Sequence, residues 1–418
     1  MKKPWCALSV TLFAAGLLAI AQAQAEAAEN VKIGVIYPLT GNAASAGQSA
    51  KDAVNLGVEI VNTAHPELKA LPLGATAGLP NLGGAKIELD EADHQGNPQV
   101  GQQQTLRLIT QDHVVAMLGS YHSSVSLVAT AAAERQGIPY LVADSVALNI
   151  TGRGFKWTFR TTPIASDFAK AYAGFLSDLR KSGRKIDKIA VVNENTDYGT
   201  SVAGSILEAA KEANITVAAQ IPYNANSSDV SAQVIQLKTA QPDVVIFISY
   251  TADTILYFRT MKNLDYLPPI IIGDDAGFSD PTFVPNVGDL AQGAINRSAF
   301  DIGKPGSNSY IVNQLFKAKY GRDLDDTSAR WMQGFFVLAD AINRAGSSEP
   351  DKIQAALQAT DLKADQLMIG YNGVKFDSTG QNTLASTFLI QLQGKQYVSV
   401  WPSSLATGKL ELPMKGWR

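Results

Sequence analysis

Polar side chains that suit a small charged ligand follow three short apolar runs of the chain. These segments are Gly119-Ser-Tyr-His-Ser-Ser124, Asn193-Glu-Asn-Thr-Asp-Tyr-Gly199 and Gly273-Asp-Asp275. Ser123 stands where a helix is expected to begin, so its hydroxyl and the free amides of the helix end suit a carboxylate. Capping of the helix is the simpler role for this serine.

An ammonium group suits the segments farther along the chain. Asp275 offers a carboxylate, and Tyr198 and Tyr250 follow their own apolar runs and offer aromatic walls. Packing is the alternative role for the tyrosines, and capping of a turn is the alternative for the aspartate. A carboxylate-binding group together with an ammonium-binding group predicts a site for an amino acid.

Residues for catalysis or metal binding do not occur in recognised patterns. The histidines lack H-x-x-x-H or H-E-x-x-H spacing, and no Walker loop or G-x-S-x-G elbow occurs. Asp93 and His94 could form an acid–base pair, but a structural histidine is the favoured interpretation. Cys6 is the one cysteine, which excludes a disulfide scaffold and an iron–sulfur cluster. We therefore expect no catalytic residue, no metal and no cofactor.

The elements that must position these residues alternate between strands and helices. Hydrophobic periodicity predicts strands near 31–37, 86–91, 114–119, 138–143, 188–193, 216–221, 244–249 and 269–273. It predicts helices near 48–62, 98–112, 123–135, 166–181, 199–213, 229–240 and 253–263. The segment 63–85 is expected to be a long loop. Such alternation indicates parallel sheets with helices on both faces. Ligands bind outside the carboxyl ends of the strands in sheets of this kind, which is where the polar segments fall.

Three strand segments have counterparts later in the chain, in the same order. Residues 32–36 resemble 188–192, residues 114–121 resemble 244–250, and residues 138–144 resemble 269–274. Chance similarity among Val- and Ile-rich strands is the alternative explanation. The repeated order predicts two lobes of similar topology.

The first 25 residues have the pattern of a secretory signal peptide. A short cationic start precedes an apolar run over 6–20, and A-x-A cleavage patterns end at Ala23 and Ala25. A retained N-terminal anchor is the alternative. No later stretch reaches the roughly 18 apolar residues of a membrane span. With 35 basic and 38 acidic residues, the chain has no basic surface for nucleic acid. We expect a periplasmic protein.

These segments together resemble the periplasmic leucine/isoleucine/valine-type solute-binding proteins of ABC transporters. The resemblance rests on the signal peptide and on VKIGVIYPLTG, GSYHSS, NENTDYG and SSDVSAQVIQLKTAQPDVVIF, and extends over residues 30–401. It implies a type I periplasmic-binding fold, with two doubly wound lobes joined by three hinge crossovers. The implied lobes are residues 30–162 with 299–375, and residues 163–298 with 376–418.

The resemblance also implies a set of ligand-binding residues. Ser123 matches a carboxylate-binding serine, and His122 lies in the same turn. Tyr198 and Tyr250 match ligand-facing tyrosines of the second lobe, and Asp275 matches an acidic residue that holds an ammonium. The remaining candidates are the strand-end residues Asp144 and Ser145, and Ala46, which stands where branched-chain binders can carry an aromatic residue.

The resulting expectation is a monomeric, non-enzymatic protein that captures an amino acid or similar small carboxylate and delivers it to an ABC permease. A ligand-sensing protein for a small amide or amino-acid-like molecule is the alternative. The ligand class stays open among branched-chain, aromatic, acidic and amide compounds.

Overall fold

The computed structural model describes residue 1 and residues 29–415. Apart from Met1, the expected signal peptide lies outside the described residues. Within the described part of the chain, no helix has both the length and the hydrophobicity needed to cross a membrane.

The first sheet is entirely parallel and has five strands in the order β2-β1-β3-β4-β5. Its strands are rich in buried aliphatic residues, as expected for a sheet covered on both faces. The strands are β1 (Val31–Tyr37), β2 (Ile87–Asp93), β3 (Ala116–Gly119), β4 (Tyr140–Val142) and β5 (Thr158–Arg160).

The second sheet has seven strands in the order β14-β13-β10-β9-β8-β6-β7. The run from β7 to β10 is parallel, and β13 and then β14 are added antiparallel beside β10, with β14 at the edge. The strands are β6 (Lys188–Glu194), β7 (Thr216–Tyr223), β8 (Val244–Ile248), β9 (Ile271–Gly273), β10 (Ile295–Ser298), β13 (Phe388–Gln393) and β14 (Gln396–Trp401). A small antiparallel hairpin pairs β11 (Asp361–Lys363) with β12 (Gly373–Lys375).

The parallel parts of the two sheets have the same strand order. Strands β1 to β5 of the first sheet correspond one by one to β6 to β10 of the second, with order 2-1-3-4-5 matching order 7-6-8-9-10. The three sequence echoes fall on β1 and β6, β3 and β8, and β4 and β9. The prediction of two lobes with similar topology is therefore confirmed.

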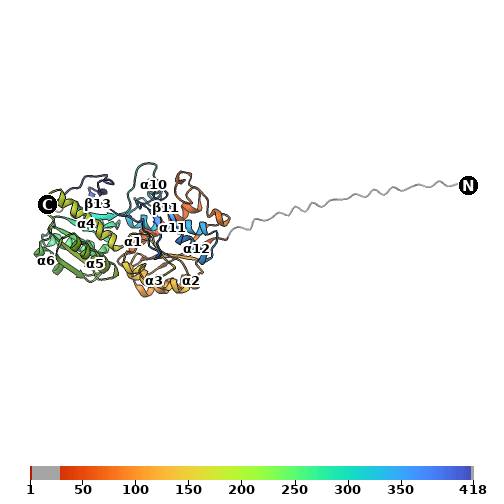
Figure 1. Ribbon diagram of the computed structural model, residues 1–418, viewed down its shortest axis with the longest axis horizontal. Helices are drawn as coiled ribbons and strands as arrows, with labels where there is room; N and C mark the ends of the chain where they lie inside the picture. The colour runs from red at the N-terminus through yellow and green to blue at the C-terminus, as the bar shows by residue number, and fades with distance from the viewer. Residues whose placement is uncertain (2–28, 416–418) are drawn as a thin grey trace.

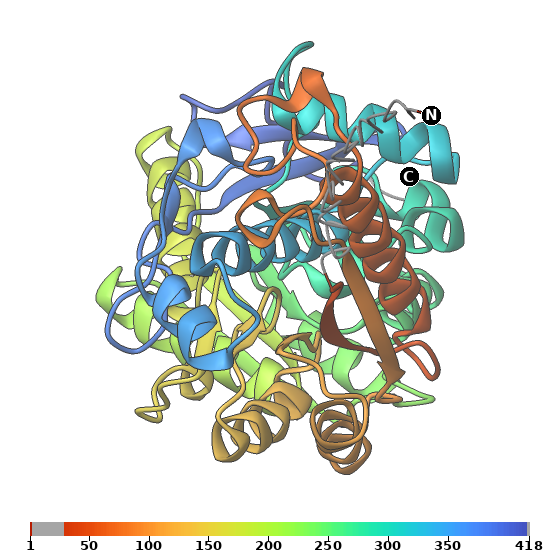
Figure 2. The ribbon, with the colours of Figure 1, turned by 90° about the vertical axis from the view of Figure 1, so that its right-hand side faces the viewer.

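Helices cover both faces of each sheet, so each lobe has three layers (Figures 1 and 2). On the first sheet, α1 and α11 pack together on one face while α2 and α3 cover the other. The helices of this lobe are α1 (Ala44–Asn62), α2 (Pro98–Thr110), α3 (Ser123–Gln136), α10 (Asn308–Tyr320), α11 (Asp326–Ala345) and α12 (Pro350–Gln358).

On the second sheet, α4 and α5 pack on one face, and α6, α7 and α9 cover the other. The helices of this lobe are α4 (Ala165–Lys181), α5 (Asp197–Glu212), α6 (Ser231–Ala240), α7 (Thr251–Asn263), α8 (Ala276–Ser279) and α9 (Phe283–Val287). Short 3-10 turns occur at Pro66–Leu68, Pro80–Leu82, Leu148–Ile150, Gly288–Ala291 and Ala364–Gln366.

The structure departs from the sequence prediction mainly in the C-terminal third. The strands β5 and β10 to β14 and the helices α8 to α12 were not predicted, and the antiparallel strands β13 and β14 make the second sheet mixed rather than parallel. Strand β10 has the sequence Ile-Asn-Arg-Ser, and its three polar side chains are buried because each forms hydrogen bonds with residues of other segments. The segment 63–85 is a loop with two 3-10 turns, close to the prediction.

The chain passes between the two sheets three times, after β5, after β10 and after β12. The first and third crossovers are joined by hydrogen bonds around Arg160, which is fully buried. Its side chain donates to Oε1 of Gln381 at 2.7 Å, to the carbonyl of Ala147 at 2.7 Å and to Oγ1 of Thr151 at 2.8 Å. Its backbone also pairs with Gly380 and Asn382.

Replacing this arginine should weaken the fold. In Arg160→Met the buried oxygens of Gln381 and Ala147 lose their guanidinium donors and keep only the longer bonds from Thr151 and Ile150. We therefore expect the free energy of unfolding to fall by about 2–4 kcal/mol in urea denaturation. Arg135→Met, at an exposed position of α3, is the control and should change stability by less than about 0.5 kcal/mol. Equal stability of both variants would contradict the role of Arg160.

Candidate functional site

A small cavity lies between the two lobes, at the carboxyl ends of their strands. Both lobes contribute through equivalent connections, which follow β3 and β4 in the first lobe and β6, β8 and β9 in the second. Its walls include six of the eight residues predicted from the sequence. The full lining is Tyr121, Ser123, Asp144, Ser145, Val146, Tyr198, Tyr250, Asp275, Ala276 and Arg297.

The first lobe contributes a wall of hydroxyl and amide groups. Ser123 is the first residue of α3, and the preceding His122 gives the helix no side-chain cap. The Ser123 hydroxyl accepts a hydrogen bond from the backbone of Ala147 at 3.4 Å. The Ser145 hydroxyl donates to the carbonyl of Tyr121 at 3.0 Å. This wall therefore presents a hydroxyl and the positive end of a 14-residue helix.

Three tyrosine rings form a continuous aromatic wall. The ring of Tyr250 lies 5.8 Å from that of Tyr121 and 5.3 Å from that of Tyr198, measured between centroids. Tyr121 and Tyr250 are equivalent, because each follows a serine at the end of the corresponding strand, β3 or β8. The Tyr198 hydroxyl donates to Oδ2 of Asp274 at 2.9 Å.

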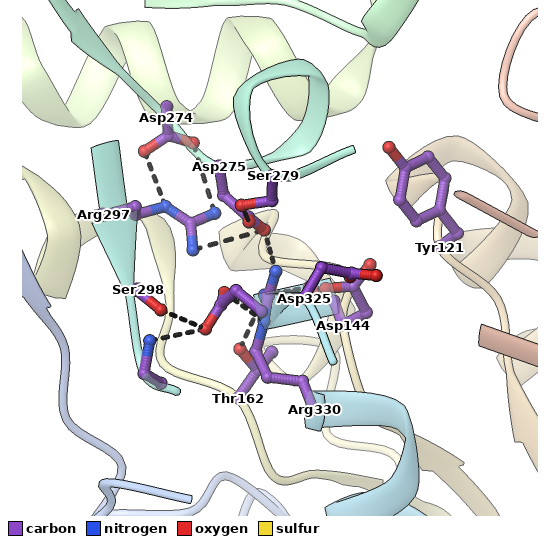
Figure 3. A network of polar contacts seen from close by, with 12 residues as sticks. Tyr121, Asp144, Thr162, Asp274, Asp275, Ser279, Arg297, Ser298, Asp325 and Arg330 are labelled. Carbon is purple, nitrogen blue, oxygen red and sulfur yellow. Dashed lines mark hydrogen bonds and ion pairs between the residues drawn. The ribbon is translucent and has the colours of Figure 1, made fainter. Parts of the chain in front are cut away.

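The opposite wall is a buried network of charges (Figure 3). Arg330 of α11 pairs with Asp144 at 2.7 Å, with Asp326 at 3.0 Å and, across the lobes, with Asp275. Asp275 also accepts a hydrogen bond from the Ser279 hydroxyl. The side chains of this network are at most 5% exposed. A direct ion pair therefore joins the lobes beside the cavity.

Arg297 of β10 completes this network. It pairs with Asp274 through Nε at 2.9 Å, lies 3.6 Å from Asp275, and its guanidinium carbon lies 3.6 Å from the centroid of the Phe168 ring. Two guanidinium groups thus face four carboxyl groups, those of Asp144, Asp274, Asp275 and Asp326. Formal charges leave two carboxylates in excess, which favours a positive group on a ligand.

Burial raises the pKa of the Asp144 carboxyl to about 6, although the neighbouring Arg330 opposes the shift. Burial also raises the pKa of Asp326, against the hydrogen bonds it accepts from the backbone of Ala299 and the hydroxyl of Ser298. The network can therefore reduce its excess negative charge in two ways, by facing a positive group of a ligand or by keeping a proton on one carboxyl.

The structure brings Ser123, Asp144, Ser145, Tyr198, Tyr250 and Asp275 to one cavity, but it does not place Ala46 or His122 in its walls. Helix α1 begins at Ala44, earlier than predicted, and Ala46 is 2% exposed within the apolar core. The His122 ring instead packs 4.8 Å from Tyr250 and 5.1 Å from Tyr121, where it supports the aromatic wall from behind.

Sequence reasoning missed both arginines of the site. Arg297 lies in an unpredicted strand, and Arg330 lies in an unpredicted helix among large apolar residues. The signal for Arg330 was its spacing from Asp326, which lies one turn earlier on the same helix. The expected partner of Asp275 was a ligand ammonium, and in the structure its carboxylate already faces Arg330 and Arg297.

Other contacts also cross between the lobes at the rim of the cavity. Ser45 of α1 donates to Asp280, and the backbone of Leu148 donates to the Ser201 hydroxyl at 3.0 Å. Within residues 29–415, no group of three His, Cys, Asp or Glu side chains is placed to hold a metal ion. Two lobes closed on a small polar cavity define a protein that encloses a small ligand.

Comparisons with known proteins identify the family. The model of the family described as "Periplasmic binding protein" matches residues 30–396. Leu/Ile/Val-binding protein homolog 8 of Brucella abortus (strain 2308) is 32% identical over 420 residues, which cover 97% of this chain and 96% of the relative. The chain therefore belongs to the periplasmic binding protein family.

Solved structures show the same fold. The leucine-binding protein LivK of Thermotoga maritima has a TM-score of 0.75 at 21% identity, covering 88% of this chain and 97% of that one. A solute-binding protein of an ABC transporter from Rhodopseudomonas palustris BisB5, solved with 3,4-dihydroxybenzoic acid, has a TM-score of 0.73 at 18% identity, covering 89% and 96%. The predicted type I fold is confirmed.

Family membership also decides the general role. Proteins of this family carry small solutes outside the cytoplasm and are not enzymes, so this chain is an extracytoplasmic solute-binding protein. The predictions of a non-enzymatic, solute-binding protein are confirmed by the family assignment.

The raised pKa of Asp144 predicts a pH dependence of stability. Between about pH 4 and pH 6 the folded protein keeps a proton on Asp144 that the unfolded chain has released, so the contribution of Asp144 to the free energy of unfolding should fall as pH rises through this range and then level off. In Asp144→Asn this fall should be smaller by about 1–3 kcal/mol, measured by urea denaturation at several pH values. Arg330 keeps two carboxylate partners in this variant.

The exposed substitution Glu212→Gln is the control for the loss of one negative charge. It should leave the pH profile of the wild-type protein unchanged. A profile of Asp144→Asn that follows the wild type from pH 4 to pH 6 would show that Asp144 does not titrate there.

Proposed function

We propose that this protein binds an α-amino acid between its lobes and delivers it to an ABC permease. The observation that carries the proposal is the polarity of the cavity, which has a helix N-terminus with a serine on one wall and an excess of buried carboxylate on the other. An α-amino acid carries the complementary charges, a carboxylate and an ammonium, on one carbon.

The carboxylate of the ligand is assigned to the wall of the first lobe. Ser123 donates its hydroxyl proton to the ligand, and the first amides of α3 direct their dipoles toward the same place. Ser145 holds the carbonyl of Tyr121 and so fixes the turn between β3 and α3. This arrangement recognises a carboxylate through hydrogen bonds and a helix dipole, without a cation from the protein.

The ammonium is assigned to the carboxyl groups of Asp144 and Asp275, which line the cavity from opposite lobes. Both pair with Arg330, but the network keeps an excess of two carboxylates in which an ammonium group is favourable. Tyr198 and Tyr250 form the aromatic side of this end. A ligand placed in this way contacts both lobes and stabilises their closed arrangement.

The relatives support an amino acid as the ligand and an ABC permease as the partner. The Brucella relative is named a Leu/Ile/Val-binding protein homolog, the Thermotoga neighbour is a leucine-binding protein, and the Rhodopseudomonas neighbour is a solute-binding protein of an ABC transporter. We further propose that residues 1–25 are a cleaved signal peptide, that the mature chain is a periplasmic monomer, and that the lobes are residues 30–162 with 299–375 and residues 163–298 with 376–418. A sensing role would require a partner other than a permease.

Removal of the Ser123 hydroxyl tests the carboxylate assignment. A hydrogen bond to a charged group contributes roughly 1.5–3 kcal/mol, so the Kd of Ser123→Ala measured by calorimetry should rise about 10- to 150-fold. The neighbouring Ser124→Ala makes the same change one residue farther into the helix and is the control. An equal Kd for wild type and Ser123→Ala would remove Ser123 from the site.

Neutralisation of Asp275 tests the ammonium assignment. Asp275→Asn should weaken an α-amino acid at least tenfold, because the carboxylate excess near the ammonium falls by one charge. The matching carboxylic acid without the amino group should lose much less. Calorimetry of both ligands distinguishes the roles, and an equal loss for the two would make Asp275 a structural residue of the interlobe ion pair.

A further inference from the structure

Two phenol hydroxyls at the cavity, those of Tyr121 and Tyr250, are shielded from solvent, and both side chains line the cavity. The Tyr121 hydroxyl has no partner among the described residues, and that of Tyr250 has only the side chain of Thr196 near it. Each residue is 6% exposed. In Figure 3 the Tyr121 ring stands apart from the charged network, and no contact is drawn to its hydroxyl. By contrast, the third tyrosine, Tyr198, donates to Asp274.

The other polar groups of the cavity are already assigned. Ser123 and the end of α3 suit the ligand carboxylate, and Asp144 with Asp275 suits the ammonium. The hydroxyls of Tyr121 and Tyr250 are therefore available to the remaining part of an amino acid, which is its side chain. A buried hydroxyl left unpaired is costly, so a ligand that pairs with it gains selectively over one that does not.

Aliphatic side chains make up little of the walls, whose apolar surface comes mainly from the three tyrosine rings that also carry hydroxyls. Val146 and Ala276 are the two aliphatic residues of the lining, whereas the other members carry hydroxyl, carboxyl or guanidinium groups. An acidic side chain is disfavoured for another reason, because the cavity already has more carboxylates than guanidinium groups. The ligand ammonium already answers the carboxylate excess in the proposed pose, so the phenol hydroxyls of Tyr121 and Tyr250 favour a polar, uncharged side chain.

We propose that the side chain of the ligand carries a hydroxyl or carboxamide that hydrogen-bonds to Tyr121 and Tyr250. This inference rests on the proposed amino-acid function and specifies its ligand class. It separates this protein from branched-chain amino acid binding, which the names of its relatives describe. The two tyrosines, equivalent in the two lobes, then act together as the specificity-determining pair.

Two pairs of amino acids with nearly equal shape test the proposal. Threonine and valine differ by a hydroxyl in place of a methyl group, and asparagine and leucine differ by a carboxamide in place of a branched alkyl group. We expect threonine to bind at least tenfold more tightly than valine, or asparagine at least tenfold more tightly than leucine. The measurement is calorimetry on the full-length mature protein after unfolding and refolding to remove bound solute.

The variants Tyr121→Phe and Tyr250→Phe should reduce this preference at least fivefold, mainly by improving the binding of the aliphatic partner. Tyr257→Phe is the matched control, because the Tyr257 hydroxyl is also buried without a partner but lies in the core of the second lobe, away from the cavity. It should leave the preference unchanged.

The outcomes separate this inference from the proposed function. If valine and leucine bind as tightly as their polar partners or more tightly, the polar-ligand proposal is overturned and the amino-acid function stands. If the preference exists but is the same in both cavity variants, Tyr121 and Tyr250 do not determine it. Absence of binding for every α-amino acid would overturn the proposed function and this inference with it.

Discussion

Arg330 connects the two lobes electrostatically, and the arrangement of the cavity depends on it. The guanidinium is 1% exposed and pairs with Asp144 and Asp326 of its own lobe and with Asp275 of the other. A buried charge of this kind is tolerated only when its partners surround it, so the lobes must be close together for the network to be complete. Closure therefore brings one guanidinium and three carboxyl groups together. Their net negative charge then acts on a ligand in the cavity.

The remaining geometry follows from the repetition of one strand order. Because β3 and β8 are equivalent, as are β4 and β9, each lobe presents an aromatic residue and an acidic residue at the same edge of its sheet. In the closed arrangement the ring centroids of Tyr121 and Tyr250 are 5.8 Å apart, and Asp144 and Asp275 both pair with Arg330. The cavity is thus approximately symmetric in its tyrosines and aspartates. Its asymmetry comes from Ser123 on one side and Arg297 on the other.

Much of the fold was predictable from local patterns, and so were the candidate residues that stand at strand ends. Ser123, Tyr250 and Asp275 lie in the short turns that follow apolar strands, so a correct strand assignment was sufficient to place them at one edge of the sheets. Ala46 depended on the start of α1, which has no side-chain cap to mark it in the sequence. Arg297 depended on recognising a strand whose polar residues are buried by distant partners. Such partners are chosen by tertiary packing, which no local pattern encodes.

The hydrogen bonds around Arg160 restrict how the lobes can move. They join the first and third crossovers side by side, so these two connections form one hydrogen-bonded unit between the lobes. Because these two connections are hydrogen-bonded to each other, they cannot bend independently when the lobes separate. The stiffness of the crossovers therefore contributes, with the contacts in the cavity, to how readily the lobes open. Evolution could therefore adjust how long the solute is retained at the crossovers, while the groups that recognise it stay the same.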